Sequence, residues 1–152
     1  MLCRFRGCDS LRALTLPEGL KRLDGLGCTN ASAISFPRSL ERINPGWLDE
    51  TEWYKIQPEG MVYAGGVCYT YKGTIPENIE IREGTKGIIY LSGDNLTHIT
   101  IPASVTYIYE HAFPNDHMLS ITYGGTKEQW SHFTVFTSTD STITCSDGVY
   151  GE

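Results

Sequence analysis

The chain has 152 residues, 40% of them hydrophobic, which suits one domain or one stretch of an elongated repeat array. The formal net charge of -6 argues against a nucleic-acid partner, because such a partner requires a cationic protein face. No apolar run approaches the length of a membrane span, so none is expected.

The amino-terminal segment, residues 1–8, is positively charged but has no apolar stretch behind it, so it does not read as a secretory signal peptide. Two interpretations follow: a cytoplasmic protein, or a mature form without its leader. Charge is also unevenly distributed. Residues 1–42 hold seven basic and four acidic side chains (+3), and the remainder holds five basic and fourteen acidic ones (-9). This asymmetry fits either ordinary solvated surface or molecules that stack end to end.

A 20-residue repeat starts at Cys8. Its first two copies predict coils near 8–26 and 28–48. Within it, Leu14 and Leu16 alternate with Ala13 and Thr15, which is the period of a β-strand with one face inward. A proline then ends the strand, because it has no N–H for the ladder. Shifting the pattern by 20 recovers the same residue classes at Cys28, Ala31, Ile34, Phe36, Pro37, Leu40 and Ile43.

The register breaks at about residues 49–73, where roughly 25 residues are extra. Two alternating runs flank Gly65-Gly66, which predicts a tight β-hairpin, since glycine tolerates the positive φ of such turns. The region is crowded with aromatic residues. Large aromatics are usually buried for their area, which favours a cover over the interrupted solenoid. The alternative is a recognition patch, because such side chains dominate interface hot spots.

The repeat resumes in coils near 74–93, 94–117 and 118–150. The third coil has Arg82 where the first, second and fourth coils have proline, and the last coil matches the repeat only in its first half. The strands of these coils are expected to point the following residues inward: Ile79, Ile81, Ile99, Ile101, Ile121 and Tyr123. Their outward positions would continue two polar ladders, Ala13–Ala33–Asn78–His98–Ser120 and Thr15–Ser35–Glu80–Thr100–Thr122.

The carboxyl-terminal part contains a capping-box pattern, with Thr126 at the N-cap and Gln129 reaching back. It predicts a short helix from Lys127 to about Phe133, with Trp130 folded over the last coil. A solenoid needs such an end to hide its final apolar face.

Chemistry-bearing residues form no catalytic or metal pattern. None of the five cysteines belongs to a CxxC pair, so no zinc site is expected. Cys8 and Cys28 share one repeat position, and we expect both to be reduced and buried as neighbours. His111, Asp116 and His117 lie close together in the sequence, but their spacing matches no metal or acid–base motif, and we interpret them as polar residues of a surface turn. We therefore expect no enzyme activity, no cofactor and no metal.

The pattern Cxx-L-xx-I-x-I-P-xx-V-xx-I-xxxx-F resembles the BspA-like leucine-rich repeat family of bacterial surface proteins. Residues 121–130 and 143–148 also resemble the way such arrays end. The resemblance implies a mainly β repeat solenoid spanning 1–152 as one domain: a right-handed leucine-rich-repeat superhelix with short parallel strands, the hairpin insert and a short C-terminal capping helix.

The resemblance also implies a non-catalytic module that binds a protein or glycan at the cell surface or outside the cell, although a cytoplasmic location is not excluded by the sequence. The alternative is a structural spacer in a longer array, whose uncapped N-terminal coil associates end to end. If the chain binds a partner, we place the contact on the insert first, with two outward residues of the strand ladder as secondary contacts: Trp53, Tyr54, Tyr63, Tyr69 and Tyr71, then His98 and Thr100.

Overall fold

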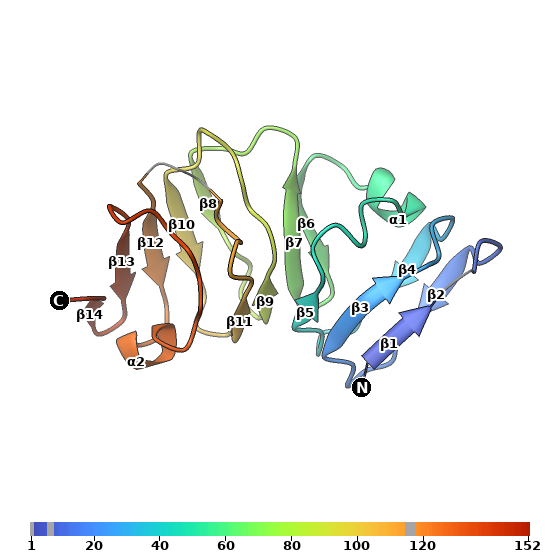
Figure 1. Ribbon diagram of the computed structural model, residues 1–152, viewed down its shortest axis with the longest axis horizontal. Coiled ribbons are helices and arrows are strands. Elements are labelled where there is room, and N and C mark those ends of the chain that lie inside the picture. The colour runs from blue at the N-terminus through green and yellow to red at the C-terminus, as the bar shows by residue number, and fades with distance from the viewer. Residues whose placement is uncertain (1, 6–7, 115–117) are drawn as a thin grey trace.

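The computed structural model describes the backbone of residues 2–5 and the whole of residues 8–114 and 118–152. It is a β-solenoid of about six turns with parallel strands and little helix. Figure 1 shows the turns stacked side by side in an arch, with the two termini at opposite ends. Among the described residues, no helix is long and apolar enough to cross a membrane.

One wall of the solenoid consists of the strands that precede each corner. They form a two-stranded sheet, β2 (Ala13–Thr15) with β4 (Ala33–Ser35), and a larger parallel sheet that ends in an antiparallel β13–β14 pair. The larger sheet contains β8 (Asn78–Glu80), β10 (His98–Ile101), β12 (Ser120–Tyr123), β13 (Thr142–Cys145) and β14 (Gly148–Val149). Its register pairs Ile99 with both Ile79 and Ile121, which confirms the repeat alignment.

The opposite wall consists of the strands that follow each corner, again mainly parallel. Its N-terminal sheet is β1 (Leu2–Phe5), β3 (Arg22–Leu26) and β5 (Arg42–Ile43). Its C-terminal sheet is β6 (Gly60–Ala64), β7 (Val67–Lys72), β9 (Gly87–Ile88) and β11 (Tyr107–Ile108).

Two serines link neighbouring turns at the corners. The Ser39 hydroxyl accepts a hydrogen bond from the Gly19 N–H and donates one to the Leu20 carbonyl, both at 2.9 Å. Ser104 repeats this bridge with the Gly84 N–H and the Thr85 carbonyl. Each serine therefore supplies hydrogen bonds to backbone groups at a corner, where no strand ladder pairs them and they would otherwise bond to water.

The predicted hairpin forms from β6 and β7, with Gly65 at φ +58° in the turn. It lies inside the stack, because β7 pairs in parallel with β9. The two faces of the hairpin contact different cores. Val62 and Ala64 pack in the N-terminal core, whereas Met61 and Tyr63 pack against the C-terminal core. The insert thus serves as one of about six turns, where the sequence suggested five coils and an appended element.

The hairpin and α1 (Glu52–Lys55) also change the expected ladders. Among the described strands β4 pairs only with β2, and β8 pairs only with β10, so the two polar ladders stop between Ala33 and Asn78. At this break α1 sits on the second turn, where the Trp53 N–H donates to the Ala31 carbonyl at 2.9 Å. The prediction of continuous five-coil ladders is therefore wrong at the insert.

The predicted inward and outward residues largely match the structure. Eight of the ten expected core positions are buried, and Leu14 and Phe36 are half-buried. Thr15, Ser35 and Thr100 are exposed, as the alternation predicts. Leu14 and Phe36 also point inward, since both pack against the N-terminal core although they are only partly buried.

The C-terminal cap forms as predicted. In α2 (Lys127–Trp130), Thr126 and Gln129 make both hydrogen bonds of a capping box, and Trp130 is buried at 3% exposure. The α-helix ends at Trp130 and not near Phe133, because His132 and Phe133 make i→i−3 hydrogen bonds to Gln129 and Trp130. Trp130 packs on Tyr123 of β12 at 5.4 Å between ring centroids.

Candidate binding pocket beside the hairpin

A pocket of about 360 Å³ lies where β7, the segment after β5 and the segment after β9 meet. We call it the tyrosine pocket, because three tyrosine rings line it. Its lining residues are Pro45, Gly46, Asp49, Tyr54, Tyr69, Thr70, Ile89 and Tyr90. Its place follows from the insert, which interrupts the regular stacking of turns on this side of the solenoid.

Tyr69 forms the rigid inner wall of the tyrosine pocket. It is 2% exposed, and its hydroxyl accepts a hydrogen bond from the Leu48 N–H at 3.2 Å and donates one to Asp49 Oδ1 at 2.7 Å. Burial raises the pKa of Tyr69, and the bond to Asp49 raises it further. The phenol therefore keeps its proton at neutral pH and donates it in the hydrogen bond to Asp49.

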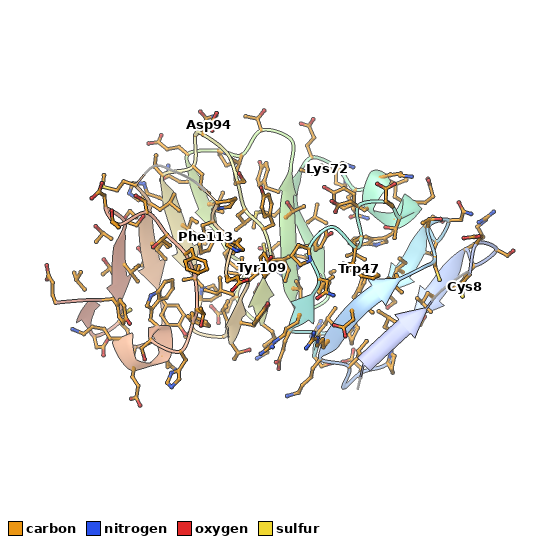
Figure 2. The ribbon with its side chains drawn as sticks, viewed as in Figure 1. Cys8, Trp47, Lys72, Asp94, Tyr109 and Phe113 are labelled. Atoms are coloured by element: carbon orange, nitrogen blue, oxygen red, sulfur yellow. The ribbon has the colours of Figure 1, made fainter. Side chains whose placement is uncertain are left out.

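Tyr54 lies almost perpendicular to Tyr69, with ring centroids 5.9 Å apart and an interplanar angle of 79°. The short helix α1 positions it: the Thr51 side chain caps the helix by accepting from the Tyr54 N–H at 3.1 Å. Lys72 fastens the other end of α1, since its ammonium donates to the carbonyls of Tyr54, Lys55 and Gln57 at 2.7–3.1 Å. Figure 2 shows Lys72 beside this helix.

Two aromatic side chains are exposed in the segments that line the pocket. Tyr90 is 42% exposed on its rim, and Trp47 is 46% exposed in the same 45–49 segment that lines it. The Trp47 ring lies against the backbone of Gly25, in the space that a Cβ would occupy at that position (Figure 2). Trp47 is therefore held on one side while the remaining surface of its indole meets solvent.

Among the described residues, Asp49 alone brings a charge to the lining of the tyrosine pocket. Its side chain is exposed, and Tyr69 holds one of its two oxygens. Within the described ranges 8–114 and 118–152, the other oxygen, Oδ2, makes no hydrogen bond or ion pair. The pocket thus combines aromatic faces with one oriented carboxylate oxygen.

The structure brings together only part of the predicted contact set. Tyr54 and Tyr69 share the tyrosine pocket. Trp53 is buried against Phe36, with ring centroids 4.9 Å apart. Tyr71 is half-buried on the C-terminal core. A binding role for these rings stays a prediction.

Tyr63 is bound within the fold. Its hydroxyl accepts a hydrogen bond from the Arg82 N–H at 2.9 Å, and the Arg82 guanidinium lies 4.1 Å from its ring centroid. His98 and Thr100 are exposed on β10, in a different sheet from β7. The His98 Nδ1 atom lies 3.0 Å from the Thr97 hydroxyl. The two predicted secondary contacts are therefore separate from the tyrosine pocket.

Sequence reasoning did not select Asp49 or Tyr90. Tyr90 lies 21 residues after Tyr69, and its N–H donates to the Tyr69 carbonyl at 3.1 Å. Extending the repeat register into the insert would have placed these two rings on neighbouring turns. Asp49 carries the same signal, since it precedes Tyr69 by 20 residues, which is one repeat length.

A second hollow, of about 320 Å³, lies beside β11 near the C-terminal segment. It contains charges of both signs, Arg42 and Glu110. The Arg42 guanidinium already lies 4.4 Å from the Tyr107 ring centroid. This hollow therefore lacks the single oriented charge of the tyrosine pocket.

Metal-binding and acid–base groups are sparse in the structure. Over the described part of the chain, no group of three or more His, Cys, Asp and Glu side chains is arranged to hold a metal ion. His111 is exposed and lies 3.7 Å from a Glu110 carboxylate oxygen. Asp116 and His117, the other members of the site weighed from the sequence, lie outside the described residues.

The parallel walls, the regular corners and the stacked core define a leucine-rich-repeat type of β-solenoid. A family model described as "BspA type Leucine rich repeat region (6 copies)" matches residues 3–88, more than half of the chain. The chain belongs to this family. Such solenoids are usually non-catalytic, and the comparison indicates no catalytic family.

No curated protein and no solved structure matches the chain significantly. The family model ends at residue 88. The evidence that later turns continue the repeat is the parallel register of β8, β10 and β12 and the matching sequence positions.

Proposed function

We propose that this leucine-rich-repeat chain is a non-catalytic protein-binding module that contacts its partner around the tyrosine pocket. The observation that carries the proposal is the pocket itself, where rings from three segments meet an oriented carboxylate beside the exposed Trp47 and Tyr90. Tyrosine and tryptophan supply large contact areas with little conformational entropy to lose on binding. Family membership agrees with a protein at the cell surface, which remains part of this proposal.

Two other functions compete with this one. A glycan ligand would use the same rings, and the exposed His98 and Thr100 in the other sheet would offer a second, separate contact. A spacer function would need no ligand at all. The outermost strands at the N-terminal end, β1 and β2, would support it if copies of the chain associate there end to end.

The test is selection of ligands for the whole chain from a displayed peptide library and from a glycan panel. Peptides that bind should lose affinity by about tenfold or more when Tyr90→Ala or Trp47→Ala removes an anchoring ring. Tyr150→Ala is the matched control, because Tyr150 is similarly exposed at 39% but lies next to the C-terminus.

Binding that is unaffected by both pocket variants would place the contact elsewhere and overturn the proposal. Selection of glycans alone would favour the glycan function. A chain that selects nothing but self-associates at low concentration would favour the spacer.

A further inference from the structure

We infer that the tyrosine pocket receives the cationic side chain of an arginine or lysine from the partner protein. This inference rests on the proposed function and adds the chemistry that the pocket recognises. It is carried by two features: the fixed acceptor formed by Asp49 and Tyr69, and the aromatic walls formed by Tyr54, Tyr69 and Tyr90.

The acceptor is oriented before any ligand arrives. Tyr69 donates its proton to Asp49 Oδ1 at 2.7 Å and is itself held by the Leu48 N–H. The second carboxylate oxygen makes no hydrogen bond to the described residues. A guanidinium or ammonium donor would complete this oxygen with a charge-assisted hydrogen bond, which is stronger than a neutral one.

The walls are suited to a cation because aromatic faces carry negative electrostatic potential. Tyr54 and Tyr69 pack edge to face with ring centroids 5.9 Å apart, so a cation would meet the solvent-facing side of the half-buried Tyr54, and Tyr90 adds a second accessible ring at the rim. Lys72 lies 5.3 Å from the Tyr54 centroid, and three carbonyl oxygens hold it. It therefore stays with α1, and among the described residues no cation pairs with Asp49.

The polar groups of the pocket favour a cation over a sugar. The Tyr54, Thr70 and Tyr90 hydroxyls of the lining can donate and accept, as a sugar requires, but they are neutral. The negative charge of Asp49 is the feature of the lining that distinguishes a cation from a sugar. The Tyr69 proton is already committed to Asp49. The region after Arg42 has an excess of nine negative charges, which attracts basic partners over distance.

The experiment is an NMR titration of the isotope-labelled whole chain with two probes, N-acetyl-arginine amide and N-acetyl-citrulline amide. The probes have nearly the same shape, but only the first is charged. We expect arginine to shift the backbone resonances of Gly46, Thr70 and Tyr90 with a dissociation constant on the order of millimolar, and citrulline to bind about tenfold more weakly.

Two variants assign the effect to the carboxylate. Asp49→Asn keeps an oxygen that accepts from Tyr69 but removes the charge, so arginine binding should weaken about tenfold while citrulline binding is unchanged. Glu50→Gln is the control, since Glu50 is the exposed neighbour that does not line the pocket. If Asp49→Asn does not fold, raising NaCl from about 0.05 M to about 0.5 M in the unmodified chain should weaken arginine binding selectively.

Equal binding of arginine and citrulline would overturn the cation inference, and so would shifts from a free hexose where arginine gives none. Either result leaves the peptide selection with Tyr90→Ala and Trp47→Ala to decide the proposed function separately. Absence of any shift with arginine also overturns the inference.

Discussion

At the residue scale, Arg82 explains why one turn departs from the repeat. Proline at the equivalent positions, such as Pro37 and Pro102, has no N–H and ends its strand without leaving a donor. Arg82 has an N–H, and the Tyr63 hydroxyl of the insert accepts it at 2.9 Å. The replacement of proline and the insertion of the hairpin are therefore linked, because Tyr63 of the hairpin supplies the hydroxyl that accepts the Arg82 N–H.

The cysteines correct one expectation and confirm another. Cys28 is buried, as predicted, but Cys8 is only half-buried, because its turn is the first of the described stack and is covered on one side only. Both are thiols, and they contact each other, as the repeat register predicted. Native Cys28 should therefore resist alkylation, whereas Cys8 should react.

Buried thiols also make stability depend on alkaline pH. Burial, with the Cys8 contact adding to it, raises the pKa of Cys28 to about 11, and burial raises the pKa of Cys68 to about 12. In the unfolded chain both thiols ionise near pH 8.5. Between this pH and the folded pKa values the unfolded state loses its protons first, so the free energy of unfolding should fall as pH rises.

Urea unfolding at pH 7, 8, 9 and 10 measures this dependence. Each thiol contributes a slope of at most about 1.4 kcal/mol per pH unit above pH 8.5. Cys68→Ala should give a shallower slope than the unmodified chain, whatever its stability at pH 7. An identical slope in the two proteins would show that Cys68 does not titrate differently in the folded state.

At the element scale, the hairpin accounts for its own aromatic density. A regular turn has one inward and one outward face, but β6 and β7 have a core on each side. Positions that would be polar on an outer strand are therefore apolar here. In β6, Met61 and Tyr63 lie on one face and Val62 and Ala64 on the other, and each face packs on a core. Burial against two cores, and not partner contact, is the structural reason for most of these rings.

The C-terminal element makes a separate prediction. Trp130→Ala opens the end of the C-terminal core and should lower the free energy of unfolding by roughly 3–5 kcal/mol, because a large ring is lost from a packed site. Thr126→Ala removes only the cap of α2 and should cost about 1 kcal/mol.

Chemical denaturation of these variants, with Thr139→Ala as an exposed control, checks the order of the effects. If Trp130→Ala cost no more than Thr126→Ala, α2 would be a peripheral helix and not the cover of the last turn.

At the scale of the whole molecule, the hairpin divides the interior into two hydrophobic cores. Turns of a solenoid contact only their neighbours, so a local defect destabilises nearby turns most. Phe113→Ala, in the C-terminal core, should therefore accelerate amide exchange in β10 and β12 more than in β2 and β4. Leu20→Ala, in the N-terminal core, should do the reverse.

Native-state hydrogen exchange at the strand amides measures both effects. The two variants control for each other, since both remove a side chain that is 1% exposed. Equal acceleration throughout the chain in both variants would mean that the two cores open as one cooperative unit.

Much of this fold follows from local sequence. Alternation predicts which strand residues point inward, and a spacing of about 20 predicts which residues pair, as Ile79, Ile99 and Ile121 do. The capping box of Thr126 and Gln129 and the Gly65-Gly66 turn were also predictable, because both depend on residues close together in the chain.

Tertiary structure decided the role of the insert and the position of the candidate site. A hairpin pattern specifies the β6–β7 pairing but not which neighbours the hairpin will meet. Its position within the stack depends on long-range contacts such as Tyr63 with Arg82. The repeat spacing places Asp49, Tyr69 and Tyr90 on neighbouring turns, but only the packing of the insert within the stack gives the tyrosine pocket its shape. Sequence periodicity determines pairing between equivalent positions, whereas contacts across an interruption of the period depend on the three-dimensional packing.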